Sequence, residues 1–372
     1  MKKTLALILT IAMAVALLSG CTGTTVVIGE CTCPVDAHTE TPAATEAAPA
    51  PEATTAAPEA PAAEGAVKTG LSVSTKISDS VSATADANGS AVYDVTVAAV
   101  TVDDNGVIQS CTIDSIPATI EFDATGSIVT DLATVIDTKN EKGENYGMVA
   151  WGGAIAEWDA QVKAVADYAV GKTIDELKNG DIDMTTGKAK DGTDLQSSAT
   201  IYLAGYVYAI EAAVNNAQHL GAQAGDELVL TTMNKISSST SCVNEEDGAA
   251  QLDADIVALT RKDGVITSCY IDSLQAKVAF NTAGAITTDL TAPVATKNEL
   301  GENYGMVAWG GAIAEWNEQA ASYAKHITGM TAAEVAGIAI DETTKPADGT
   351  DLKSSVTISI GGFQALIAKA MQ

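Results

Sequence analysis

The chain repeats itself, and this repeat sets the size of the unit that must fold. The block TKNEKGENYGMVAWGGAIAEW begins at Thr138 and recurs at Thr296, 158 positions later. The two blocks differ only at Lys142 against Leu300. Solenoid repeats have periods of about 20–50 residues, far shorter than this one. Each copy is therefore expected to be a whole domain rather than one turn of a repeat array.

A second duplicated stretch, a small polar cassette, supports the same division. DGTDLQSSATIY begins at Asp191 and DGTDLKSSVTIS at Asp348, 157 positions later, so one residue is lost between the two blocks. We expect the first domain to cover 69–220 and the second 228–372.

The first half of each copy predicts strands. Apolar-alternating runs flank Asn105-Gly106 in the first copy and Asp263-Gly264 in the second, and an Asx-Gly pair in that setting is a strong hairpin signal. A further short strand is expected in ATIEF and in AKVAF, each followed by another turn at Gly126 or Gly284.

The second half of each copy predicts helices. Apolar residues at 3-4-3-4 spacing indicate one amphipathic helix per copy: Ile155, Trp158, Val162, Val165 and Ala169, then Ile313, Trp316, Ala320, Tyr323 and Ile327. Gly171 and Gly329 end these helices. The segments TIYLAGYVYAIEAAV and TISIGGFQALIAKAM, just beyond the cassettes, are apolar almost all round, which suits a buried helix. The expected fold class is α+β: two tandem copies of an antiparallel sheet covered by helices.

The N-terminal stretch has the features of an export signal followed by a spacer. Two lysines precede the apolar run Leu5–Leu18, which is too short to span a membrane. The run ends in Leu-Ser-Gly-Cys21, which resembles the bacterial lipobox; an ordinary secretion signal with a chance cysteine is the alternative. We expect residues 1–20 to be a lipoprotein signal peptide and Cys21 to carry the lipid (palmitate and related acyl chains) that anchors the protein at the outer face of the cell membrane. Residues 21–68 are rich in Ala, Pro, Thr and Glu and are expected to form a disordered stalk.

Composition excludes several classes of function. The formal net charge of −28 argues against nucleic-acid binding, since phosphate backbones would be repelled. No Ser/His/Asp set or paired carboxylates stand out, and no metal-ligand spacing is present. Cys111 and Cys269 occupy equivalent places in strand-like runs and are expected to be buried small hydrophobes. Cys31 and Cys33 lie in the stalk, where a redox or metal role has little support.

The cassette itself allows two interpretations. Asp194 and Asp351 stand just before helical runs, and Asp is a favoured N-cap, so the cassette is explained as a helix start. A helix N-terminus is also a site for anions, because its free N–H groups and dipole attract negative charge. Short hydroxyl side chains would let a phosphate approach closely: Ser197, Ser198, Thr200, Ser354, Ser355 and Thr357.

The first cassette resembles the flavinylation motif of FMN-binding domains, D-x-x-(S/T)-G-A-T. Asp194, Ser197, Ala199 and Thr200 match, and Ser198 stands where Gly is usual. In that family a flavin transferase takes FMN from FAD and esterifies its phosphate to the final Thr. The resemblance therefore implies up to two covalent FMN groups, on Thr200 and Thr357.

The second cassette departs further from the motif. Asp351, Ser354 and Thr357 match, but Ser355 replaces Gly and Val356 replaces Ala. Because Val356 is the bulkier residue, Thr200 is the better candidate for modification on sequence grounds.

The arrangement of the whole chain extends the resemblance. A lipobox, a stalk and two FMN-binding domains are similar to the PplA-type flavinylated lipoproteins of Gram-positive extracellular electron transfer. This resemblance implies an electron carrier rather than an independent enzyme. It implies a membrane NADH dehydrogenase and quinone system as the electron donor and an extracellular acceptor such as ferric iron. The rival hypotheses are a surface lipoprotein that binds a ligand or the cell wall non-covalently, and a purely structural surface protein.

Aromatic residues of the duplicated block are further candidates. Trp151 and Trp309 lie beside Gly pairs, and we hypothesise that each packs on the isoalloxazine ring of a flavin. The alternative is that each plugs the core at a helix start. Trp158 and Trp316 lie on the apolar stripe and are expected to be core. Four neighbours are weaker candidates for pocket residues: Tyr146, Met148, Tyr304 and Met306.

Overall fold

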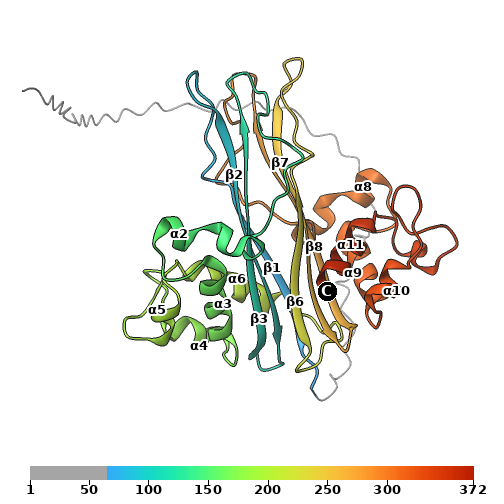
Figure 1. Cartoon of the computed structure of the whole chain (residues 1–372). Helices are drawn as coiled ribbons and strands as arrows, with labels where there is room; N and C mark the ends of the chain where they lie inside the picture. The colour runs from blue at the N-terminus through green and yellow to red at the C-terminus, as the bar shows by residue number, and fades with distance from the viewer. Residues whose placement is uncertain (1–64) are drawn as a thin grey trace, which may run out of the picture. The chain divides into compact units, whose positions relative to one another are not determined.

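The computed structural model describes residues 65–372 (Figure 1). The expected signal peptide, Cys21, the Cys31/Cys33 pair and nearly all of the expected stalk lie outside the described residues. Within 65–372 no helix is long and apolar enough to cross a membrane. The α+β prediction is confirmed, because each copy is a three-stranded antiparallel sheet with helices.

The two sheets have the same strand order. The first contains β1 (Lys68–Lys76), β2 (Gly89–Val102) and β3 (Ile108–Phe122), and the second contains β6 (Glu227–Lys235), β7 (Gly248–Lys262) and β8 (Val265–Phe280). β2 and β7 are the central strands, paired antiparallel on both sides.

The predicted Asx-Gly hairpins are confirmed as the turns between β2 and β3 and between β7 and β8. At the second turn both central residues have positive φ, 51° at Asp263 and 78° at Gly264, as a tight hairpin turn requires. The prediction of separate strands in ATIEF and AKVAF is wrong. They are the ends of β3 and β8, which continue without a break from the hairpin turn.

The helices of each copy follow its sheet and flank it on one side (Figure 1). The first copy contains α1 (Lys139–Lys142), η1 (Gly143–Tyr146), α2 (Met148–Gly152), α3 (Trp158–Ala169), α4 (Ile174–Asn179), the short pair β4 (Ile182–Asp183) and β5 (Lys188–Ala189), α5 (Asp194–Ser198) and α6 (Ala204–Asn215). The second contains α7 (Lys297–Leu300), η2 (Gly301–Tyr304), α8 (Met306–Gly310), α9 (Trp316–Ile327), α10 (Ala332–Ala336), η3 (Asp351–Ser354) and α11 (Gly361–Ala370).

The amphipathic helices begin later than the apolar spacing predicts. α3 starts at Trp158, and Ile155 is outside it with 55% of its surface exposed. Gly153, with φ of 62°, ends α2, and Glu157 is extended at the N-cap of α3. The chain between them is therefore a loop, and the same correction holds for Ile313 before α9.

The cassettes do not open the long apolar helices, which is a second correction. α5 is only five residues long, the chain is extended at Ala199, and α6 starts at Ala204. The N-cap of α5 is Thr193, whose hydroxyl accepts a hydrogen bond from the Gln196 amide at 3.3 Å. Asp194 is the first helical residue rather than the cap.

Each sheet buries both of its faces. One face, including Val95 and Val97, belongs to a core cluster that the two copies share, with residues such as Leu252 and Ile256 from the second copy. The other face, including Ala98 and Val100, packs under α3 and α6, and the second copy has the matching cluster under α9 and α11. The described residues 65–372 therefore belong to one compact unit.

The core also tests the predictions for single residues. Trp158 and Trp316 are buried, as expected. Cys269 is buried and Cys111 is partly buried against the core of the first copy, which agrees with their interpretation as small hydrophobes. The first domain begins slightly before the expected boundary at residue 69, because Val67 is buried and Lys68 starts β1.

Candidate functional site

The two candidate threonines occupy the same environment. In the first copy the Thr200 amide and hydroxyl both donate to Oε1 of Gln161, at 2.8 and 3.2 Å. In the second copy the Thr357 amide and hydroxyl donate to Oε1 of Gln319, at 2.7 and 3.1 Å. Both glutamines are fully buried, whereas Thr200 is exposed and Thr357 is partly exposed. Each threonine is therefore presented at the surface by a residue anchored in the core.

Each glutamine belongs to a helix turn that organises the site. Gln161 is in the first turn of α3, and its side-chain amide donates to the Ala156 carbonyl at 2.8 Å, which fixes Oε1 toward Thr200. Glu157, the N-cap of the same helix, accepts hydrogen bonds from the Met148 and Val149 amides at 2.8 and 3.0 Å. The Glu157 carboxylate thereby satisfies two free backbone amides at the N-terminus of α2.

The second copy repeats these hydrogen bonds. Glu315 accepts from the Met306 and Val307 amides at 2.8 and 3.0 Å, and Gln319 donates to the Ala314 carbonyl at 2.8 Å. The glutamine was missed in the sequence, although a signal existed. EWDAQ and EWNEQ keep Glu, Trp and Gln while the two residues between Trp and Gln diverge.

The serines of the cassettes do not converge on the threonines. The hydroxyls of Ser197 and Ser198 donate back to the Asp194 carbonyl at 2.7 and 3.2 Å. Ser354 does the same to Asp351 at 2.7 Å, and Ser355 donates to Leu352 at 3.3 Å. These hydroxyls satisfy helix carbonyls, and the side chains of Asp194 and Asp351 are exposed.

The expected helix-terminus anion site is also not formed. Thr200 follows the C-terminal end of α5, so its hydroxyl does not lie at a helix N-terminus. Ala199 and Val356 are both buried in the core clusters. The extra bulk of Val356 is therefore accommodated in the core, which removes the steric reason for ranking the second cassette below the first.

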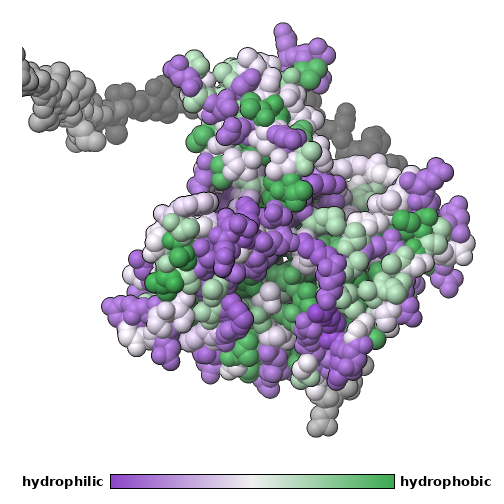
Figure 2. Space-filling model, viewed as in Figure 1, coloured by the Kyte–Doolittle hydropathy of each residue, from purple (hydrophilic) through white to green (hydrophobic). Residues whose placement is uncertain are grey.

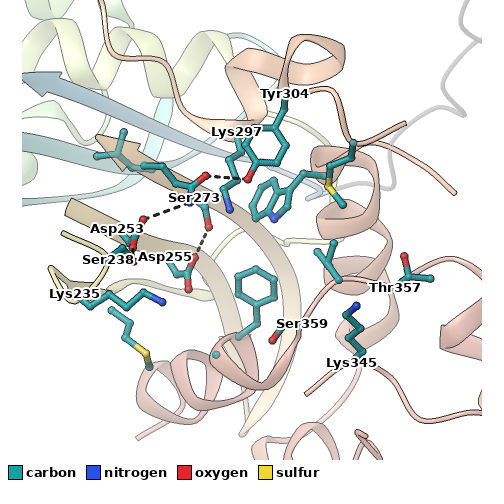
Figure 3. Close-up of a pocket in the computed structure, with 18 residues that line it drawn as sticks. Lys235, Ser238, Asp253, Asp255, Ser273, Lys297, Tyr304, Lys345, Thr357 and Ser359 are labelled. Atoms are coloured by element: carbon teal, nitrogen blue, oxygen red, sulfur yellow. Dashed lines mark hydrogen bonds between the residues drawn. The ribbon is translucent and has the colours of Figure 1, made fainter. Parts of the chain in front are cut away.

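A cavity of about 630 Å³ opens beside Thr357 in the second copy (Figure 3). β-strand residues, α9, α11 and the loop after η3 all contribute to its wall. The lining residues are Met233, Lys235, Ser238, Asp253, Asp255, Ser273, Leu274, Gln275, Lys297, Tyr304, Met306, Trp316, Lys345, Thr357, Ile358, Ser359, Gly362 and Phe363. A volume of this size is within the usual range for small-molecule and cofactor pockets, about 300–1,000 Å³.

A lysine ammonium group lies over the aromatic side chains of the cavity wall. Lys297 Nζ lies 5.0 Å from the ring of Trp316 and 5.2 Å from the ring of Tyr304. Trp316 also meets Phe363 edge-on, with ring centroids 6.1 Å apart. In the first copy Tyr206 stands in place of Phe363, and its hydroxyl accepts a 2.9 Å hydrogen bond from the Trp158 indole. Phe363 offers Trp316 no such acceptor.

Three lysines line the cavity, and among residues 65–372 none of Lys235, Lys297 and Lys345 forms an ion pair. Two carboxylates of the cavity, by contrast, are satisfied by hydroxyls. Ser238 donates to Asp253 at 2.5 Å and Ser273 donates to Asp255 (Figure 3). With three lysines against two carboxylates, the lining has a small excess of positive charge, in a protein that is otherwise strongly acidic.

The lysines of the first copy are engaged differently. Lys76, at the place of Lys235 in β6, pairs with Asp79 at 2.8 Å. Lys139, at the place of Lys297, pairs with Asp94 at 3.4 Å while it covers the rings of Tyr146 and Trp158. The two sites thus share the threonine geometry but differ in the charge available beside it.

Trp151 and Trp309 are outside the core, so the core-plug interpretation is wrong. They are 84% and 85% exposed. Each ring lies against a glycine: a Cβ at Gly147 would be 2.4 Å from a Trp151 ring carbon, and one at Gly305 would be 2.5 Å from a Trp309 ring carbon. Trp309 is not among the residues that line the described cavity, whereas Trp316, expected only to be core, and Met306 are.

A buried carboxylate in each copy positions the duplicated block. Asp272 accepts from the Ser273 amide at 2.7 Å and the Asn298 amide at 3.2 Å, and Asp114 accepts equivalent bonds at 2.7 and 3.1 Å. Burial raises the pKa of Asp272 to about 6, and it raises the pKa of Asp114 as well. Asp272 and Asp114 thereby connect the middle of β8 and of β3 to the first turn of α7 and of α1.

The described residues offer no metal site, and the comparisons with known proteins give no relative. Within the described part of the chain no group of three or more His, Cys, Asp or Glu residues could hold a metal ion. Comparison with protein-family models, curated proteins and solved structures finds no match. The resemblance to FMN-binding domains therefore rests on the residues of this chain alone.

Proposed function

We propose that the chain is an electron-transfer flavoprotein that carries FMN as a phosphoester on Thr200 and Thr357. The observation that carries the proposal is the presentation of Thr357 at a 630 Å³ cavity with aromatic walls and three lysines. The same threonine geometry at Thr200 supports a second attachment point. When bound, the flavin would supply the redox chemistry, and the protein would supply position, polarity and the covalent tether.

The cavity of the second copy fits the parts of an FMN. Flat apolar rings favour aromatic surroundings, and Trp316, Tyr304 and Phe363 line the cavity, with Lys297 lying over two of these rings. Lys345 lies on the same side of the cavity as Thr357 in Figure 3, where it can offset the charge of a phosphate esterified to that residue. Ser359 and Gln275 add polar groups to the wall, where Ser359 is hydrogen-bonded to Thr344 and Gln275 to Tyr304 and Asp253.

The wider role extends the resemblance of the whole chain. We propose a lipid anchor at Cys21, a flavin transferase as the modifying partner, and transfer of electrons from a membrane NADH dehydrogenase and quinone system to an extracellular acceptor such as ferric iron. A covalent tether suits this location, because a dissociating cofactor would be lost by dilution outside a cell. The alternative is non-covalent binding of an anionic ligand in the same cavity, which the unpaired lysines would also favour.

Co-expression of the full chain with a flavin transferase tests the attachment. The variants Thr200→Ala and Thr357→Ala should each lose one flavin, measured as visible absorbance per chain and as flavin on the denatured protein. The matched control is Thr350→Ala, a nearby threonine whose hydroxyl donates only to the Ala347 carbonyl and which should keep both flavins. Flavin that is bound but released on denaturation would support the non-covalent alternative and contradict the phosphoester.

A further inference from the structure

Gln161 and Gln319 control the direction in which the hydroxyls of Thr200 and Thr357 point. Each Oε1 accepts two hydrogen bonds from one threonine, and the other half of each amide is held by a backbone carbonyl. Because both glutamines are fully buried, their orientation is set by the core and not by solvent. The threonine hydroxyl must therefore direct its proton inward, and its lone pairs face away from the glutamine.

That orientation leaves the lone pairs of the hydroxyl oxygen free to face an electrophile that approaches from outside. We propose that Gln161 and Gln319 are positioning residues that aim the hydroxyls of Thr200 and Thr357 at a flavin dinucleotide held by the transferase. This inference rests on the proposed function, since it concerns the step that attaches the flavin. An oriented nucleophile contributes to rate because it reaches the near-attack geometry without a search through other rotamers.

The attachment step balances without any redox change. A bond forms between the threonine Oγ1 and the flavin-side phosphorus of FAD, and the pyrophosphate P–O bond breaks. AMP leaves with the bridging oxygen, and the hydroxyl turns its proton from the glutamine to a general base supplied by the transferase as Oγ1 attacks. A neutral amide does not take that proton, so the glutamine orients the hydroxyl without acting as its base. After the step Oγ1 has no hydrogen to donate, and the glutamine keeps only the threonine amide.

The two copies allow a test within one chain. The variant Gln319→Leu removes the acceptor of both the Thr357 amide and its hydroxyl. Modification at Thr357 should then be slower than at Thr200 by about tenfold, the scale of losing the hydrogen bond that orients the hydroxyl. The sites are separated by peptide mass spectrometry in a time course, so Thr200 reports transferase activity and the fold of the chain. Gln161→Leu should reverse the ratio. The loss should be in kcat with KM nearly unchanged, because the surface that the transferase contacts is retained.

A structural glutamine in the same copy provides the matched control. Gln364 donates to the Val335 and Ile338 carbonyls at 2.9 and 3.0 Å and makes no bond to Thr357. Gln364→Leu should therefore leave the Thr357 to Thr200 ratio unchanged. If Gln364→Leu and Gln319→Leu lower the ratio equally, or raise KM rather than lower kcat, the glutamine is structural and the positioning role is overturned.

The variant Gln319→Glu gives a second readout that a structural role would not produce. A protonated Glu is isosteric with Gln: one oxygen can accept from Thr357, and the O–H can donate to the Ala314 carbonyl. Burial raises the pKa of such a carboxyl, and its ionised form loses the donation to Ala314, so the Thr357 to Thr200 ratio should change across this titration, whereas in the unaltered chain it should stay constant. A ratio independent of pH would contradict the proposal. If neither threonine of the unaltered chain gains flavin, the proposed function fails and the positioning role fails with it.

Discussion

Phe122 and Phe280 stack face to face, with ring centroids 4.0 Å apart and planes inclined by 3°. One ring ends β3 and the other ends β8, so each copy contributes half of this contact. Tyr93 of the first copy adds a 2.8 Å hydrogen bond from its hydroxyl to the Ala250 carbonyl of the second. The duplicated sequence thus builds one shared core rather than two independent ones.

The stack predicts that the copies unfold together. Phe280→Ala should lower the free energy of unfolding by about 3–5 kcal/mol, because a fully buried ring is replaced by a cavity. Urea denaturation followed through Trp158 in the first copy and Trp316 in the second should show the same shift. The exposed Val135→Ala should change stability by less than about 0.5 kcal/mol. A shift confined to the second copy would show that the core is not shared energetically.

Asp272 predicts a pH dependence of stability with a definite sign. Burial raises its pKa from 3.8 to about 6 in the folded protein, so ionising it opposes folding. The cost is absent below pH 4 and complete above the folded pKa of about 6. Because one pKa unit corresponds to about 1.4 kcal/mol, the full effect is about 3 kcal/mol.

Asp272→Asn isolates this effect, because the amide oxygen can still accept from the Ser273 and Asn298 backbones. The variant should be more stable than the natural chain at pH 7–8 by up to about 3 kcal/mol and nearly equal to it at pH 4. Thermal denaturation across this range measures the difference. A stability difference that does not grow between pH 4 and pH 7 would contradict the raised pKa.

From the position of Lys345 we expect ligand binding in the second copy to weaken as the salt concentration rises. In chain prepared without a transferase, free FMN should bind the cavity, and Lys345→Ala should weaken that binding by about fivefold, the scale of one partly exposed ion pair. The effect should shrink at high ionic strength. Lys353 is the matched control, since it already pairs with Asp341 at 3.8 Å and Asp348 at 3.5 Å. Equal losses from both variants, measured by flavin fluorescence titration, would refute a specific phosphate contact.

The two tryptophans of the second copy should behave oppositely. Trp316→Leu removes buried surface and should cost about 2–4 kcal/mol, whereas Trp309→Leu, at an exposed position, should change stability by less than about 0.5 kcal/mol. Trp316 lines the cavity, so its replacement should also alter the emission of a flavin attached at Thr357. A change in flavin emission from Trp309→Leu alone would instead support the stacking hypothesis for the exposed ring.

Local chemistry explains what could be predicted from the sequence. The hairpins follow from Asx-Gly pairs, and the amphipathic helices follow from apolar spacing, since both depend on residues near one another. The helix start was predicted too early because spacing alone cannot detect that Gly153 ends α2 and Glu157 caps α3. The cassette was assigned the wrong cap because Thr193, one residue before Asp194, captures the first-turn amide.

Long-range relationships could not be predicted in the same way. Gln161 lies 39 positions before Thr200, and nothing in its local sequence indicates that they meet. The shared core depends on which face of β2 packs against the other copy. Because the consecutive residues Ala98, Ala99 and Val100 are all buried, their pattern does not indicate which face meets the helices and which meets the other copy. The charge difference between the two sites is by contrast local: Asp79, three residues after Lys76, pairs with it, whereas Ser238 stands at that place after Lys235.

The most direct test of the central claim is the intact mass of the full chain after co-expression with a flavin transferase. The account predicts two added FMN phosphoesters, with one lost in Thr200→Ala, one in Thr357→Ala and both in the double variant. A chain that gains no flavin mass alongside an active transferase, or flavin that maps to residues other than these two threonines, would contradict it.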